Sequence, residues 1–246
     1  MIDVVIPTVF AGFSHVNAIF TKANRSQFPS GNKIQGFNFG ITTNSDLHEV
    51  ESNYQLLLQQ LGLEKENLVL GKQSHGTGIK VVSEAGIYPE TDGFITTSKK
   101  LYLGIQVADC AAILIADPRN NIAGAFHAGW RGAINGILPK GLAMMKEEGG
   151  NNKYFHAFIS PCISHKAFEV GEEVAQLFPD EFCDRYSYKK THIDLTGYII
   201  SQLTRGGIPP KNIEVSDSCT FGNSEYFSYR REREKAGRML ALIGFK

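Results

Sequence analysis

Three short motifs each place a potential metal donor beside a signal for a change of chain direction. KQSHGTG carries His75 before a glycine, VADC ends an apolar run on Cys110, and FHAGWRG carries His127 where another apolar run ends. Catalytic groups commonly lie in loops and at the ends of strands. Taken singly, such a cysteine indicates core packing, and such a histidine indicates a surface or hydrogen-bonded structural role. Their shared setting favours a common functional site.

One thiolate and two imidazoles are a suitable donor set for zinc. Three protein ligands leave the fourth tetrahedral position open, as catalytic zinc sites require, and the ion then polarises a substrate oxygen or activates water. In this chain 34 residues separate His75 from Cys110, and 16 separate Cys110 from His127. Structural zinc fingers bring their ligands in close pairs instead. The spacing therefore favours a catalytic ion over a structural one, with these three residues as catalytic and metal-binding candidates.

The only tryptophan, Trp130, and its neighbour Arg131 stand between Gly129 and Gly132. The glycines allow the backbone to turn sharply. A helix is expected to begin near Gly132, and its free N–H groups together with the Arg131 guanidinium would suit a phosphate near His127. The alternative is that Trp130 fills the core and Arg131 forms a surface ion pair.

Weaker candidates lie in the second half of the chain. The charge-rich segment FSYRREREKAGRM is typical of a solvated face, but its Tyr229 and Arg230 could face a ligand. Cys162 in SPCI follows an apolar run and a proline, and we expect it to be buried structure. Asp109, next to Cys110, could orient a ligand or nucleophile, or cap a turn.

Hydrophobic periodicity predicts the elements that position these residues. Helices are expected over 46–61, 132–147 (kinked at Pro139), 171–178 and 194–205. Strands are expected over 68–70, 79–82, 93–96, 101–107, 111–116, 122–126, 155–159 and 239–245. Segment 22–36 is rich in chain breakers and is expected to be a surface loop. This order predicts an α+β fold with a mixed sheet, or a pair of sheets, flanked by helices.

Composition narrows the class of protein. The 25 basic and 25 acidic side chains cancel, which argues against a protein held to nucleic acid mainly by counterion release. A hydrophobic content of 42% supports a real core, and no apolar stretch reaches the length of a membrane span. The N-terminus lacks the pattern of a signal peptide, and the four cysteines form no CxxC motif. We therefore expect a cytoplasmic protein with reduced thiols and no membrane or nucleic-acid partner.

Several motifs occur together in the order typical of one family. The chain resembles the multicopper polyphenol oxidase (laccase-domain) family, also described as purine nucleoside phosphorylases, over roughly residues 70 to 246. The shared motifs are KQSHG, DGFITT, VADCAAILIAD, FHAGWRG, SPCISHKAFEVGEEV, HIDL and SCTFGNSEYFSYRR with a following GR. Nearer the N-terminus, FT at 20–21 and NFG at 38–40 fit, whereas KANRSQFPSGN replaces the expected arginine and glycine pair. Ser160 replaces the usual glycine before PC.

The resemblance implies a single domain over 1–246, folded as an α/β sandwich of mixed sheets, with zinc bound by His75, Cys110 and His127. It implies phosphorolysis of adenosine, inosine, guanosine and S-methyl-5'-thioadenosine, with adenosine deamination at the same site. Purine nucleosides and phosphate are then the expected partners. From their residue types, we expect Arg131 and Arg230 to contact phosphate and Tyr229 to stack on the base.

Other functions stay open at the level of sequence. The seven histidines form no HxH pair, so a cluster of several coppers is not expected. A copper-dependent polyphenol oxidase would need one copper in place of zinc, and copper(II) outcompetes zinc for Cys/His ligands. A metal-free cysteine hydrolase would use Cys110 as nucleophile with His127 or His75 as base. The HxE and PCxxC signature of zinc nucleoside deaminases is absent, so any deaminase activity needs a different arrangement. A zinc ion that only ties strands together is the non-enzymatic alternative.

Overall fold

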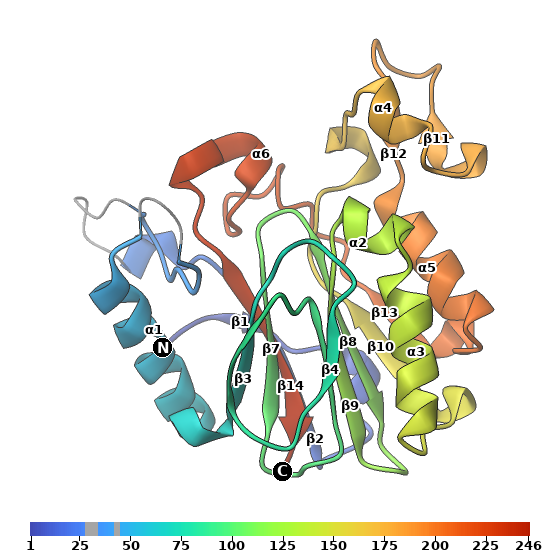
Figure 1. Cartoon of the computed structure of the whole chain (residues 1–246). Coiled ribbons are helices and arrows are strands. Elements are labelled where there is room, and N and C mark those ends of the chain that lie inside the picture. The colour runs from blue at the N-terminus through green and yellow to red at the C-terminus, as the bar shows by residue number, and fades with distance from the viewer. Residues whose placement is uncertain (28–33, 42–44) are drawn as a thin grey trace.

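The structure, a computed structural model, describes residues 1–27, 34–41 and 45–246. These residues form two six-stranded sheets and one two-stranded sheet (Figure 1). The strands are β1 Val4–Val5, β2 Val16–Thr21, β3 Leu68–Lys72, β4 Ile79–Val81, β5 Gly86–Pro89, β6 Gly93–Thr96, β7 Tyr102–Val107, β8 Ala111–Asp117, β9 Ile122–Ala128, β10 His156–Ile159, β11 Cys183–Asp184, β12 His192–Ile193, β13 Ile213–Val215 and β14 Met239–Phe245. The helices are α1 Leu47–Leu61, α2 Trp130–Ile134, α3 Ile137–Glu147, α4 Glu172–Ala175, α5 Leu195–Arg205 and α6 Tyr229–Glu232.

The two large sheets stack between layers of helices (Figure 1). Sheet 1 has the strand order β1-β2-β14-β7-β3-β5, and sheet 2 has the order β13-β10-β8-β9-β6-β4. Helix α1 packs its buried Leu57 on the outer face of sheet 1, against Leu70 and Leu242. Helices α2, α3 and α5 cover the outer face of sheet 2. This arrangement confirms the prediction of mixed sheets flanked by helices.

Strand β8 shows how the sequence produces this layering. Ala112 and Leu114 point into the core between the two sheets, whereas Ile113 and Ile115 point toward the helices on sheet 2. Every residue of β8 is buried because both faces of the strand are covered. A strand of this kind appears in the sequence as a continuous apolar run instead of an alternating one.

Parallel and antiparallel pairings together gather several strand ends at one edge of the molecule. Strand β3 runs parallel to β7, so their C-terminal ends lie at the same edge. The chain passes from the end of β7 directly into β8, which pairs with β9 in antiparallel register. Ala112 of β8 lies opposite His127 of β9. The end of β9 therefore meets the start of β8 where β3 and β7 also end.

Two predicted helices differ from the structure. The helix expected over 132–147 is wrong: α2 and α3 replace it, separated at Gly136, whose φ of 82° is left-handed. Pro139, the expected kink, lies in the first turn of α3, where a missing N–H removes no helical hydrogen bond. The helix expected over 171–178 is reduced to the four residues of α4. Of the loop expected over 22–36, positions 28–33 lie outside the described residues.

Over the described ranges, no helix combines the length and the apolar character needed to cross a bilayer.

Candidate metal centre

The structure brings the three donor side chains to one place. His75 lies in the loop after β3, Cys110 lies between β7 and β8, and His127 lies near the end of β9. One donor atom from each residue lies within 4.8 Å of the other two. The rings of His75 and His127 meet edge to face, with their centroids 4.7 Å apart. Within the part of the chain that the structure describes, these residues form the one such His/Cys/Asp/Glu cluster.

Burial differs among the three donors and gives the cluster one open side. His127 is only 2% exposed, Cys110 is partly buried, and His75 is exposed. His75 also has a left-handed φ of 61°, which is uncommon for a residue with a side chain. Strained backbone of this kind concentrates at functional sites, where the surrounding contacts hold it in place. A ligand can therefore approach the cluster from the side of His75.

The buried carboxylate of Asp92 holds two of the donors in position. Its Oδ1 lies 2.7 Å from Nδ1 of His127 and accepts the backbone N–H of His75 at 2.9 Å. Its Oδ2 accepts the backbone N–H groups of Ser74 and Gly76 and the hydroxyl of Ser74, each at 3.0 Å. With Nδ1–H donated to Asp92, Nε2 of His127 presents its lone pair to a metal ion. Carboxylates commonly orient metal-binding histidines in this way.

Asp92 stands in the motif DGFITT, but the sequence analysis assigned it no role. An aspartate before a glycine normally indicates a turn, because its side chain bonds to nearby backbone. Its complete burial and its bond to His127, which is 35 residues away, are visible only in the folded chain.

The charges of the site are strongly coupled. Burial raises the pKa of the Cys110 thiol, but the neighbouring His127 and His75 outweigh burial and bring it to about 6. Burial lowers the pKa of His127, but the Cys110 thiolate and the Asp92 carboxylate outweigh burial and raise it to about 9. Burial likewise opposes the charge of Asp92, and its bonds to His127 and to backbone N–H groups hold its pKa well below the usual range. The metal-free cluster therefore favours a thiolate beside an imidazolium at neutral pH.

Asp109 anchors the turn that carries Cys110. Its φ of 82° is left-handed, and its carboxylate is 8% exposed. Oδ1 accepts the hydroxyl of Thr220 at 2.6 Å, whereas Oδ2 accepts the hydroxyl of Ser228 at 3.0 Å and the backbone N–H of Arg230 at 2.6 Å. Asp109 therefore ties the C-terminal segment to the turn before Cys110, and an orienting role toward a ligand or nucleophile stays a prediction.

The structure places the other sequence candidates around this centre. Arg131 is exposed in α2, with its guanidinium carbon 4.7 Å from the Trp130 ring centroid, and Trp130 packs against the core of sheet 2. Tyr229 is exposed and donates its hydroxyl to Glu234 at 2.8 Å. Arg230 donates from Nη2 to the Glu169 carbonyl at 2.8 Å. Cys162 is buried, as expected, with its sulfur 3.5 Å from the Thr196 hydroxyl.

Gly129 makes room for the Cys110 thiol. A Cβ at position 129 would lie 2.8 Å from Sγ of Cys110 and 3.6 Å from Cδ2 of His75. Gly129→Ala is therefore expected to displace the thiol, lower the affinity for zinc and destabilise the protein by about 1–3 kcal/mol. Zinc titration and thermal unfolding test this result. Gly12→Ala is the control, because nothing lies within 4 Å of a Cβ there. Equal zinc affinity in the two variants would contradict the prediction.

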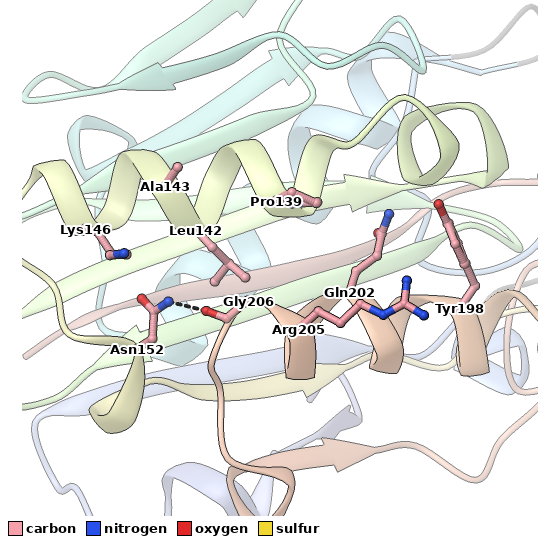
Figure 2. Close-up of a pocket in the computed structure, with 9 residues that line it drawn as sticks. All are labelled: Pro139, Leu142, Ala143, Lys146, Asn152, Tyr198, Gln202, Arg205 and Gly206. Carbon is pink, nitrogen blue, oxygen red and sulfur yellow. Dashed lines mark hydrogen bonds between the residues drawn. The ribbon is translucent and has the colours of Figure 1, made fainter.

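A separate hollow lies between α3 and α5 and includes none of the three donors (Figure 2). Leu142 and Lys146 line it from α3, and Gln202 and Arg205 line it from α5. Its volume is about 450 Å³. Both helices belong to the layer outside sheet 2, and no residue of the metal centre lines the hollow.

Comparison with known proteins identifies the family. The family model described as multi-copper polyphenol oxidoreductase laccase matches residues 18–246, which include all three donors. The chain belongs to this family. The chain is 31% identical over 236 residues to a purine nucleoside phosphorylase of Corynebacterium glutamicum, covering 93% of this chain and 94% of that protein.

Two further members of the family extend the comparison. The adenosine deaminase RL5, from an unknown prokaryotic organism, is 28% identical over 237 residues, covering 89% of this chain and 90% of that protein. The crystal structure of the hypothetical protein YfiH from Bacillus licheniformis superposes with a TM-score of 0.90 at 26% identity. That match covers 100% of this chain and 97% of YfiH, so the fold of this laccase-domain protein is that of YfiH throughout.

Proposed function

We propose that this protein is a zinc-dependent purine nucleoside phosphorylase that also deaminates adenosine at the same site. Its nucleoside substrates are adenosine, inosine, guanosine and S-methyl-5'-thioadenosine. The relatives named purine nucleoside phosphorylase and adenosine deaminase support this assignment. The observation that carries it is the cluster of His75, Cys110 and His127, open on one side and braced by Asp92.

The chemistry of the donor set fits a zinc ion. A thiolate and two imidazoles are its usual ligands, and three of them leave one position for a substrate. Cys110 readily ionises here, and the bond from Nδ1 of His127 to Asp92 directs Nε2 toward the ion, which takes the place of the Nε2 proton on binding. Copper(II) could occupy the same donors, since it binds such ligands more strongly than zinc. When bound, the ion supplies positive charge that polarises phosphate or water.

Phosphorolysis requires the chain to hold two substrates against each other. A phosphate oxygen forms a bond to C1' of the sugar while the bond from C1' to the purine nitrogen breaks, and the purine leaves with a proton. Positive charge develops on the sugar, so the anionic phosphate must be held close to it. Arg131 and Arg230 are our candidates for contacting phosphate, and Tyr229 is our candidate for stacking on the base. Arg131 lies in α2, four residues after His127, and Asp109, the neighbour of Cys110, accepts the backbone N–H of Arg230.

The test is a comparison of products with and without phosphate. Zinc-loaded protein is incubated with adenosine, and free adenine, ribose 1-phosphate and inosine are measured by chromatography. We expect adenine and ribose 1-phosphate in equal amounts only when phosphate is present, and inosine in its absence. Metal analysis of protein purified without added metal is expected to find zinc. Adenine release that does not depend on phosphate would contradict the assignment.

The metal-free cysteine hydrolase is the second candidate, favoured by the Cys110 thiol pKa of about 6 beside His127. An alkylating reagent separates the two candidates, because a metal-held thiolate is protected and a free catalytic thiolate is not. We expect slow alkylation of Cys110 in the purified protein and at least about tenfold faster alkylation after chelation. Peptide mapping by mass spectrometry identifies the modified cysteine. Fast alkylation that chelation leaves unchanged would support the hydrolase.

A further inference from the structure

Arg238 belongs to the GR that follows the motif SCTFGNSEYFSYRR, and the sequence analysis assigned it no role, but in the fold it lies next to the turn that carries Cys110. It immediately precedes β14, in which Met239 pairs with Val107 of β7 in antiparallel register. That register places the backbone of Arg238 next to the turn that leads from β7 to Cys110. Two segments more than 100 residues apart are thereby brought together at the edge of the sheets where the donors converge.

The stem of Arg238 is held firmly. The side chain passes over Gly40, where a Cβ would overlap its Cγ and Cβ atoms. The amide oxygen of Asn38 accepts the backbone N–H of Arg238 at 2.8 Å and that of Gly40 at 2.9 Å. The guanidinium carbon lies 5.9 Å from the ring centroid of Tyr229. The NFG segment near the N-terminus thus positions the side chain that immediately precedes the C-terminal strand.

This half-buried guanidinium has no carboxylate within 4.0 Å over the described ranges. The remaining positions, 28–33 and 42–44, contain neither aspartate nor glutamate. Its printed hydrogen bonds use Nη1 alone, to the carbonyls of Ala236 at 2.8 Å and Gly237 at 3.0 Å. In contrast, the nearby Arg25 and Arg231 both pair with Glu232.

An uncompensated, partly buried cation is costly unless an anion completes its environment. Burial lowers the pKa of Arg238, and the Cys110 thiolate is the first of the groups that oppose this effect. Asp109 and Glu234 oppose it less, and both are already engaged in other hydrogen bonds. The Nε and Nη2 edge of the guanidinium is therefore the part available to a ligand.

We propose that Arg238 is a phosphate-binding residue, which holds the anion at the open side of the His75, Cys110 and His127 cluster. This inference rests on the proposed function for the identity of the anion. A guanidinium presents two parallel N–H groups that match two phosphate oxygens, which a lysine ammonium does not. Arg238 would therefore set the position of the attacking phosphate, together with the exposed Arg131 and the partly buried Arg230.

Binding of inorganic phosphate, without nucleoside, tests the residue directly. Zinc-loaded wild type, Arg238→Met and Arg238→Lys are titrated with sodium phosphate, and sodium chloride at equal ionic strength is the reference. Both substitutions keep an unbranched stem over Gly40. Lys235→Met, which removes an exposed cation from the same segment, is the control. Zinc content and circular dichroism are compared first, and Arg238→Lys serves where Arg238→Met fails to fold.

We expect phosphate to raise the melting temperature of wild type and of Lys235→Met, with at least tenfold weaker binding in Arg238→Met and an intermediate loss in Arg238→Lys. In turnover, KM for phosphate should rise at least about tenfold in Arg238→Met, while KM for adenosine stays within about twofold. A purely structural role would change both KM values or the zinc content.

The outcomes separate the two proposals. Wild-type phosphate affinity in Arg238→Met would overturn the inference, even if the protein proves to be a phosphorylase. Phosphate binding that depends on Arg238, in a protein that releases no ribose 1-phosphate, would support the anion site and refute the proposed function.

Discussion

Cys110→Ser is expected to remove most of the zinc and nearly all phosphorolysis. Serine is almost isosteric, but its hydroxyl remains protonated at neutral pH, whereas His127 and His75 lower the pKa of the Cys110 thiol to about 6 in the metal-free protein. Loss of an outer partner of a metal ligand typically costs 10–100-fold in affinity, and loss of the ligand itself should cost more than about 100-fold. We expect turnover to fall by a similar factor or more. Zinc competition titration and the product assay measure the two effects.

Cys183→Ser is the matched control for this experiment. Cys183 belongs to β11 of the separate two-stranded sheet and is partly exposed, so its loss should leave zinc content and turnover unchanged. Full zinc occupancy in Cys110→Ser would show that the three residues do not share an ion. Full turnover in a zinc-free variant would show that the ion is not required.

Asp92→Asn is expected to weaken zinc binding and to destabilise the metal-free protein. The carboxylate receives five donors, and a carboxamide has only one acceptor oxygen. In either orientation, its NH₂ group faces donors from the His75 loop or from His127. We expect a loss of 10–100-fold in zinc affinity and of about 3 kcal/mol in the free energy of unfolding.

The difference in stability between wild type and Asp92→Asn should depend on pH in a defined direction. The folded-state pKa of Asp92 is lowered, so its contribution is present above about pH 4 and is lost as the pH falls. The Cys110 thiolate and, after it, Asp92 raise the folded-state pKa of His127 to about 9, so the share due to Asp92 is complete below about pH 6.5 and is lost as the pH rises toward 9. Chelated wild type should therefore exceed the variant most between about pH 4 and 6.5. Urea unfolding across this range measures the difference.

Asp117→Asn is the matched control for Asp92→Asn. Asp117 is also fully buried, and it accepts four hydrogen bonds at the opposite end of β8 from the metal centre. Its substitution should lower stability but leave the zinc affinity unchanged. Equal losses of zinc affinity in the two variants would show that Asp92 acts only through general stability. A flat difference between wild type and Asp92→Asn across the pH range would exclude a buried charge at Asp92.

Local sequence patterns were sufficient for much of the fold. The helix expected over 46–61 is α1, because a single apolar stripe packs on sheet 1 and Gly62 ends it in a left-handed conformation. The apolar runs at 111–116 and 122–126 became β8 and β9, since strands buried on both faces need uninterrupted apolar residues. The boundary at Gly136 was missed because the apolar spacing of α2 and α3 is continuous across it, and the turn depends on a backbone angle.

The donor chemistry of the candidate site also follows from the sequence, since a thiol and two imidazoles beside chain reversals indicate a metal whatever the fold. The convergence of the three donors does not follow from the sequence, because it depends on the pairing of β8 with β9 and of β3 with β7. The roles of Asp92 and Arg238 could not be predicted from the sequence for the same reason. An aspartate before glycine and an arginine in a charged run look solvated along the chain. In the folded chain, distant segments bury both side chains, which raises the free-energy cost of an unpaired charge. Asp92 therefore holds the donor residues in position, and Arg238 is the residue for which we propose a bound anion.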